Sequence, residues 1–264
     1  MPRFENQRVL VTGSGRGIGS AIAHRFAQEG ARIQLVARSM DELEQTRSEL
    51  APLASEVRAM TLDLVLPGSA RQLVDEVARG WGGLDIPVSN AGAAAQGGFL
   101  ELEDDAWDAG FGLKMFANLR VMKHAWPLLK ASSGHLVMIG GGTARTPERQ
   151  LSLVSAVNGG LASLSKSIAE QGIIDGIHVN LVQPGMVRTS RRQKLFEKWS
   201  SQEGIAVDVY IERTIRQLRV VRLGEPSDVA EVVAFLCSDQ SRWMQGSIVG
   251  VDGGQNKSVS LNVR

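Results

Sequence analysis

A glycine-rich turn near the start of the chain has the composition and spacing to hold phosphate groups. The run Thr12-Gly13-Ser14-Gly15-Arg16-Gly17-Ile18-Gly19 follows a short apolar stretch and opens a segment with helical periodicity. Glycines permit a tight turn and let backbone N–H groups approach an anion, and the N-terminus of the next helix carries a partial positive charge. We therefore expect a dinucleotide pyrophosphate here, the alternative being a turn that merely connects strand to helix. The expected contacts are Gly13, Ser14, Arg16, Gly17, Ile18 and Gly19.

Two arginines indicate which dinucleotide the turn would bind. In a dinucleotide-binding βαβ unit, an acidic residue at the end of the second strand bonds the ribose 2′-hydroxyl and repels a 2′-phosphate. This position is Ala37 here, Arg38 follows it, and Arg16 lies in the turn. Two guanidinium groups can converge on a 2′-phosphate, so the sequence predicts NADP(H) rather than NAD(H). The alternative is that both are solvated surface arginines.

The elements that must position these residues alternate along the chain. Short apolar or β-branched runs are separated by longer segments of helical period, which predicts an α/β, Rossmann-type, doubly wound domain with a seven-stranded, mostly parallel sheet flanked by helices. We expect strands at residues 8–12, 32–37, 57–61, 84–88, 135–139, 178–182 and 247–251. Pro87 is unexpected within such a strand because it lacks the N–H that the ladder needs. No composition shift marks a domain boundary, so residues 1–264 are predicted to form one domain.

One long interruption, at about residues 190–219, follows the sixth expected strand. It is charged and partly amphipathic, and it ends before the helix start at Pro226-Ser227-Asp228. We interpret it as a substrate lid over a binding cleft.

Four further motifs make the chain similar to the short-chain dehydrogenase/reductase family, whose glycine turn reads T-G-x-x-x-G-x-G. The resemblance covers residues 7–256, nearly the whole chain. The motifs are Asp63-Leu64, Asn90-Ala91-Gly92, Pro184-Gly185-Met186-Val187-Arg188-Thr189 and Val251-Asp252-Gly253-Gly254.

The resemblance implies a role for each of these loops in cofactor binding. Asp63 and Leu64 would contact the adenine, although an Asp at this place is otherwise a helix cap or turn residue. The segment Asn90, Ala91 and Gly92 would line the cofactor. After the sixth strand, Pro184 and Gly185 would lie beside the cofactor, and Val187 and Thr189 would hold the nicotinamide carboxamide.

The chain departs from this family at the residues that move the proton. Members use a Tyr-x-x-x-Lys pair, an upstream Ser and an Asn. The alignment places Val154 at the Tyr, Asn158 at the Lys, Lys114 at the Asn, and Gly140 or Gly141 at the Ser. The only tyrosine, Tyr210, lies far downstream. Ordinary alcohol or ketone redox chemistry is therefore in doubt, because fold alone does not establish a reaction.

Lys114 and Asn158 look like an exchange of the family's Asn and Lys, so we take these two as the candidate catalytic residues. The amine of Lys114 would return to the nicotinamide ribose from the opposite helix; the alternative is a surface lysine. Ser152, Ser155 and Tyr210 are interpreted as helix-start or packing residues. The four histidines have no metal-ligand spacing, so no metal is expected.

Composition limits the partners. The formal net charge of +1 gives no general attraction to nucleic acid or to an anionic membrane surface, so we expect a small-molecule substrate or ligand. The single cysteine, Cys237, cannot form an intramolecular disulfide, and residues 1–4 lack the apolar stretch of a secretory signal, which predicts a cytoplasmic protein. No apolar run approaches the roughly 18 residues that span a bilayer.

Three functions remain open at this point. The first is an NADP(H)-dependent oxidoreductase with a substituted active site. The second is an inactive dinucleotide-binding pseudoenzyme that acts as a sensor or scaffold. The third is a non-redox lyase or isomerase that reuses the cleft. In the family, the helix expected at residues 152–171 commonly pairs with its copy, so a homodimer or homotetramer is expected, although close packing within the monomer also explains its small residues.

Overall fold

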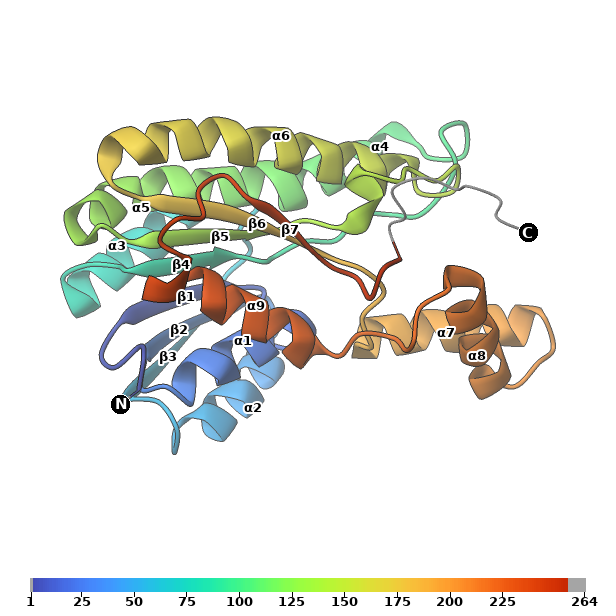
Figure 1. Ribbon diagram of the computed structural model, residues 1–264, viewed down its shortest axis with the longest axis horizontal. Coiled ribbons are helices and arrows are strands. Elements are labelled where there is room, and N and C mark those ends of the chain that lie inside the picture. Colours follow the sequence, from blue (N-terminus) through green and yellow to red (C-terminus); the bar gives the residue numbers. More distant parts are fainter. Residues whose placement is uncertain (1, 256–264) are drawn as a thin grey trace.

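A single parallel sheet forms the centre of the computed structural model, which describes residues 2–255 (Figure 1). Its seven strands run in the order β3-β2-β1-β4-β5-β6-β7. Their bounds are β1 Arg8–Thr12, β2 Arg32–Ala37, β3 Glu56–Thr61, β4 Ile86–Ser89, β5 His135–Ile139, β6 His178–Pro184 and β7 Ile248–Val251. Each predicted strand is present, and the predicted doubly wound α/β fold is confirmed.

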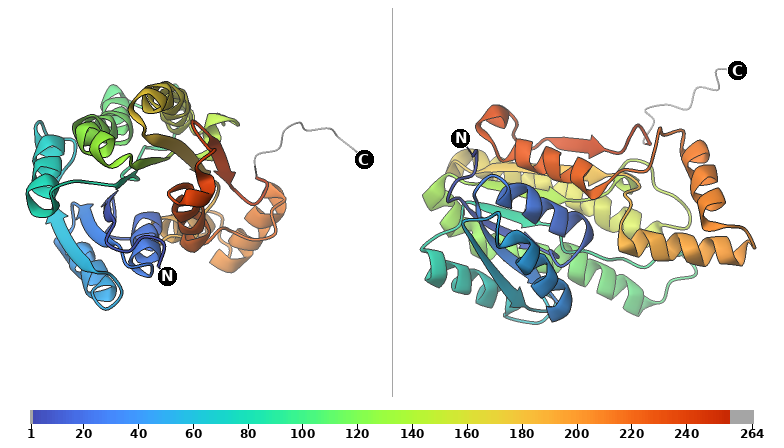
Figure 2. Two further views of the ribbon diagram at one scale, coloured as in Figure 1. Left: turned by 60° about the vertical axis from the view of Figure 1, so that its left-hand side comes forward. Right: turned by 90° about the horizontal axis from the view of Figure 1, so that it is seen from below.

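Helices cover both faces of this sheet (Figures 1 and 2). They are α1 Gly17–Ala27, α2 Met40–Leu50, α3 Ser69–Trp81, α4 Asp104–Phe111, α5 Asn118–Ser132, α6 Ser152–Asp175, α7 Ser190–Gln202, α8 Val207–Leu218 and α9 Pro226–Leu236. Because successive side chains of a strand point to opposite faces, Val9 and Val11 of β1 pack with α1 and α9, whereas Leu10 packs with α3 and α5. The strands are therefore apolar on both sides, as a buried parallel sheet requires.

Pro87 is accommodated at the start of a short strand. It pairs with Leu10 of β1. On the β5 side, the His135 N–H donates to the Asp85 carbonyl at 2.9 Å before the proline, and Val88 pairs with Val137 after it, so the contacts between the strands continue on either side of the missing N–H.

The segment predicted as a lid consists of the two helices α7 and α8, which lie beyond the carboxyl ends of the strands (Figure 1). They are held together by a small core of Phe196, Ile211 and Leu223. Tyr210 belongs to this core, with its ring 6.0 Å from that of Phe196 and 6.1 Å from that of Trp199. The only tyrosine of the chain is therefore a packing residue, as expected; the action of the two helices as a lid stays a prediction.

Among residues 2–255, no helix combines the length and the apolar character needed to cross a bilayer.

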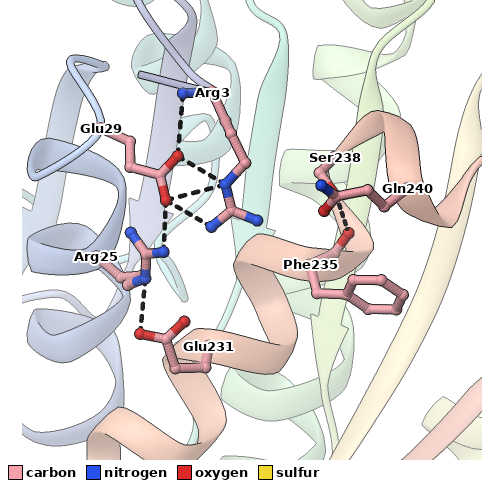
Figure 3. A network of polar contacts seen from close by, with 7 residues as sticks. All are labelled: Arg3, Arg25, Glu29, Glu231, Phe235, Ser238 and Gln240. Atoms are coloured by element: carbon pink, nitrogen blue, oxygen red, sulfur yellow. Dashed lines mark hydrogen bonds and ion pairs between the residues drawn. The ribbon is translucent and has the colours of Figure 1, made fainter. Parts of the chain in front are cut away.

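An ionic network joins the first residues of the chain to α1 and α9 (Figure 3). The Arg3 Nε donates to the Glu29 carboxylate at 2.7 Å, Arg25 also contacts Glu29, and the Arg25 Nε lies 2.7 Å from the Glu231 carboxylate. The hydrogen bond from Arg3 is the main reason why the pKa of Glu29 falls from its ordinary 4.5 to about 2. Glu29 therefore stabilises the fold while it is ionised.

We expect Glu29→Gln to lower the free energy of unfolding at pH 7 by on the order of 2 kcal/mol. The folded-state pKa lies below the unfolded one, so the stabilisation is complete above about pH 4.5 and is lost as the pH falls through about 2. Urea unfolding of wild type and variant should therefore give a difference that narrows between pH 5 and 2. Glu44→Gln, which removes only an exposed pair with Arg47, is the control and should change little. Equal stability of wild type and Glu29→Gln at pH 7 would contradict the assignment.

Candidate functional site

Two adjoining hollows lie where the order of the strands reverses between β1 and β4, at their carboxyl ends. The first, the turn cleft, has a volume of about 420 Å³ and follows the glycine turn and the loops after β2, β3 and β4. The second, the lysine cavity, has a volume of about 760 Å³ and reaches Lys114, α6 and α7. They share the lining residues Ile18, Asn90, Gly92, Ala93, Thr189 and Arg191. The two hollows thus form one groove.

The glycine turn is shaped for a close approach of backbone to an anion. Gly13 has φ +67°, and a Cβ there would lie 2.9 Å from the Cα of Ala91. A Cβ on Gly19 would lie 2.2 Å from the carbonyl oxygen of Gly13, so both positions require glycine. Helix α1 starts after Arg16 with no side-chain cap and no acidic residue in its first turn. Its first N–H groups and its positive dipole end therefore remain available, and the turn fits a pyrophosphate.

Thr12 and Asn90 hold this turn against the loop after β4. The Thr12 hydroxyl accepts hydrogen bonds from the backbone N–H groups of Asn90 at 3.0 Å and of Ala91 at 2.9 Å. In return, the Asn90 side-chain amide donates to the carbonyls of Thr12 at 2.9 Å and of Gly13 at 3.1 Å. Asn90 thus shapes the turn as well as lining the groove.

The structure brings most of the predicted cofactor residues to the groove. Those in the turn cleft are Gly13, Arg16, Gly17, Ile18, Gly19, Arg38, Asp63, Leu64, Asn90, Ala91, Gly92 and Thr189. Pro184, Gly185 and Val187 line the lysine cavity instead. Ser14 lines neither hollow: it is fully buried, and its hydroxyl accepts from the backbone N–H of Val36 at 2.8 Å. Asp63 lines the cleft and also accepts from the Val65 N–H at 3.0 Å, as a turn residue does.

The two arginines of the turn cleft have different surroundings. Arg16 forms an ion pair with Glu42 of α2, with its Nη1 2.6 Å from the Glu42 Oε1, and Glu42 itself lines the cleft. Arg38 has no ion pair within residues 2–255. An incoming phosphate would therefore meet an unpaired guanidinium at Arg38, but would compete with a carboxylate at Arg16.

Lys114 lies in a π-helical turn, Gly112–Ala117, which connects α4 to α5. The cause is Asn118, whose side-chain amide donates to the carbonyls of Ala91 at 2.6 Å and of Lys114 at 3.1 Å. A side chain that takes carbonyls from the helical ladder widens the helix locally. The widened turn directs Lys114 to the cavity.

The amine of Lys114 donates to the carbonyl oxygen of Gly140 at 3.3 Å and has no carboxylate partner in the described part of the chain. Burial, with a smaller contribution from the positive charge of Arg191, lowers the pKa of Lys114 to about 8. Lys114 is therefore a cavity residue rather than the surface lysine of the alternative interpretation.

Asn158 faces the same cavity from α6. Its amide donates to the hydroxyl of Thr143 at 2.8 Å, and its Oδ1 is buried with no hydrogen-bond donor in the part of the chain that the structure describes. Asn158 and Lys114, the two candidate catalytic residues, line the same cavity. No hydrogen bond joins their side chains within residues 2–255. A Cβ on Gly141 would lie 2.6 Å from the Asn158 amide nitrogen, and Val154 lines the wall one helical turn earlier. At the positions expected for the serine and tyrosine, the cavity carries no titratable group.

Helix α7 supplies residues that the sequence interpretation did not single out. The Thr189 hydroxyl caps α7 by accepting from the Arg192 backbone N–H at 3.2 Å. Arg191 lines both hollows and Arg192 lines the lysine cavity. Two adjacent arginines at a helix start are unfavourable next to the positive dipole end, which is a signal that the sequence did carry. Asn118 was also missed, although the sequence shows a polar residue between Ala117 and Leu119.

The fold and groove define a dinucleotide-binding protein of the doubly wound class. Residues 13–256 match the sequence model of the family described as enoyl-(acyl carrier protein) reductase. A short-chain dehydrogenase/reductase of Pestalotiopsis microspora is 30% identical over 255 residues, which is 96% of both chains. The chain belongs to the short-chain dehydrogenase/reductase family.

Two further proteins are similar over nearly their whole length. The 3-oxoacyl-[acyl-carrier-protein] reductase of Thermotoga maritima is 27% identical over 96% of this chain and 98% of its own. The crystal structure of L-sorbose reductase from Gluconobacter frateurii, complexed with NADPH and L-sorbose, has a TM-score of 0.93 at 29% identity and covers 98% of this chain and 100% of its own.

We expect Lys114→Met to raise the free energy of unfolding at pH 7 by on the order of 2 kcal/mol, because it removes a buried charge. The folded-state pKa, about 8, lies below the ordinary 10.5, so protonation favours the unfolded chain at neutral pH. Wild type should gain stability as the pH rises from 8 to 10.5, and the advantage of the variant should shrink over the same range. Lys123→Met, at an exposed position of α5, is the control for urea unfolding. A variant that is less stable than wild type at pH 7 would show that the amine supports the fold.

Proposed function

We propose that this chain is an NADP(H)-dependent oxidoreductase that reduces a carbonyl compound, with Lys114 as the proton donor. The observation that carries the proposal is the Lys114 amine, which faces the cavity with a pKa of about 8. A group with a pKa near the working pH holds its proton in the resting state and can release it to a developing alkoxide. The similarity to an NADPH-bound L-sorbose reductase supports both the cofactor and the reaction class.

Different residues of the groove bind different parts of the cofactor. The glycine turn and the N-terminus of α1 bind the pyrophosphate, and Arg38 binds the 2′-phosphate. NADPH supplies the hydride when it is bound. The Oδ1 of Asn158, which has no donor among the described residues, can accept a hydrogen bond from a hydroxyl group of the nicotinamide ribose. The Lys114 ammonium also disfavours a second positive charge nearby, so the reduced cofactor is preferred to NADP⁺ and reduction is the direction we assign.

We expect NADPH to bind more tightly than NADH by about tenfold to hundredfold, because a guanidinium–phosphate contact contributes about 1.5–3 kcal/mol. Arg38→Ala should remove most of this preference. Arg16→Ala should remove less of it, since the Arg16 guanidinium is already paired with Glu42. Fluorescence titration with both cofactors measures the ratio, and Arg71→Ala, an exposed position on α3, is the control. Equal affinities of wild type for NADPH and NADH, or an unchanged ratio of the two affinities in Arg38→Ala, would show that these arginines do not bind the 2′-phosphate.

We expect Lys114→Met to lower kcat by about 10²- to 10⁴-fold, which is the usual contribution of a positioned proton donor. Because the donor must be protonated, the wild-type rate should be high below pH 8 and fall above it. The assay is NADPH consumption over a panel of aldehydes, ketones and oxo acids, with Lys123→Met as the control. A pH profile that stays flat through 8, or a Lys114→Met rate equal to that of wild type, would exclude the proton-donor role.

The pseudoenzyme is the competing function, because no tyrosine lines the cavity. Tight NADPH binding with no consumption over the whole panel would favour it over the proposal. A homo-oligomer and a cytoplasmic location stay predictions from the sequence.

A further inference from the structure

The basic and acidic side chains that line the lysine cavity differ in their exposure to solvent. Lys114 and Arg192 line its wall and are half-buried. The two carboxylates of the lining, Glu101 and Glu148, belong to exposed segments. Glu101 is already engaged by the backbone N–H of Gly98 at 3.0 Å and the side chain of Gln150 at 3.2 Å. The less exposed charged side chains of the lining are therefore cationic.

Arg192 is the unusual member of this set. Its guanidinium makes no hydrogen bond or ion pair with any residue in the described range 2–255, and burial, followed by the charge of Arg191, lowers its pKa. By contrast, the half-buried Arg8 forms two side-chain hydrogen bonds with Asp85, at 2.7 and 2.8 Å. The half-buried guanidinium of Arg192 thus lines the cavity with its donors unused by the described residues, so it is available to an anionic ligand.

The start of α7 adds to the positive potential. Arg191 and Arg192 lie in its first turn, which contains no acidic residue, although the N-terminus of a helix favours anions. Arg191 lines both hollows and can serve the cofactor, whereas Arg192 lines only the lysine cavity. Arg192 therefore faces the substrate side of the groove.

The rest of the wall near α7 is apolar. Leu195 and Trp199 follow Arg192 along the helix, and Leu218 of α8 and Val154 of α6 complete this part of the lining. A ligand that fits has an apolar body and an anionic group.

We propose that the substrate is an anionic carbonyl compound whose carboxylate or phosphate group binds Arg192, with Arg191 beside it, while its carbonyl faces Lys114. This inference rests on the proposed function and adds the substrate class. The planar fork of a guanidinium binds either anion through two parallel hydrogen bonds, and the anion supplies the acceptor that Arg192 lacks among residues 2–255.

The test compares matched ligands that differ by the charged group. The pairs are 4-phenyl-2-oxobutanoate with 4-phenylbutan-2-one, and phenyl phosphate with phenol. Calorimetric titration of the NADP⁺-loaded protein prevents turnover, and the same titrations are repeated without cofactor. We expect at least one anion to bind about tenfold or more tightly than its neutral partner, and the stronger pair distinguishes carboxylate from phosphate.

Three variants test whether Arg192 causes the preference for the anionic ligand over its neutral partner. Arg192→Gln should abolish it, Arg192→Lys should keep part of it, and Lys194→Gln, at an exposed position of the same helix, should leave it unchanged. Arg192→Gln should also unfold at a urea concentration equal to or above that of wild type, because no side-chain hydrogen bond or ion pair within residues 2–255 is lost. A residue that mainly supports the fold would show the opposite.

The inference is overturned if neither anion is preferred by wild type, or if Arg192→Gln keeps the preference. It is also overturned if Arg192→Gln weakens NADPH binding instead, since Arg192 would then serve the cofactor. Failure of the proposed function is separate: it appears as a lack of NADPH binding or consumption, and the titrations without cofactor still decide the role of Arg192.

Discussion

The groove depends on the hydroxyl of Thr12, which joins the loop after β1 to the loop after β4. From these neighbouring strands the chain departs in opposite directions, to β2 on one side and to β5 on the other, and this divergence opens the groove. The hydrogen bonds of Thr12 with Asn90 and Ala91 keep the two loops at a fixed separation. The Thr12 hydroxyl also lies 3.3 Å from the Oδ1 of Asn118, whose amide forms the π-helical turn of Lys114. One buried threonine therefore connects the phosphate-binding turn to the candidate proton donor.

Elsewhere in the molecule, local preferences and the global fold agree. Helix α2 starts with a serine cap and two acidic residues, and α9 starts with a capping box and a proline. In the lysine cavity they disagree: within residues 2–255, a half-buried lysine has no carboxylate partner, two arginines open a helix, and a buried asparagine oxygen has no donor. Such conflicts in an otherwise consistent sequence are expected where residues serve a ligand rather than the fold.

The sequence predicted the sheet and the turn cleft because their signals are local. A run of β-branched residues marks a strand, and Gly13 and Gly19 mark backbone that only glycine permits. The role of Ser14 was not predictable, because the direction of its side chain depends on the register of β1 with β2. Lys114 and Asn158 were singled out only by a resemblance; both line the lysine cavity, no hydrogen bond joins them among the described residues, and their catalytic role stays a prediction. Arg192 and Asn118 were missed because their importance lies in partners, or in the lack of them, far along the chain.

The contact between Gly141 and Asn158 limits the order in which this active site can change over generations. A side chain at position 141 would collide with the Asn158 amide, whereas a Cβ at Gly140 would make only ordinary contacts, 3.5 Å from Leu181. A lineage that gains a serine at position 141 therefore also has to move or replace the Asn158 amide, which loses its hydrogen bond to Thr143. At Gly140, the other position expected for the serine, a side chain can be added without this change. The order of substitutions that leads back to the family's catalytic set thus depends on which of the two glycines becomes the serine.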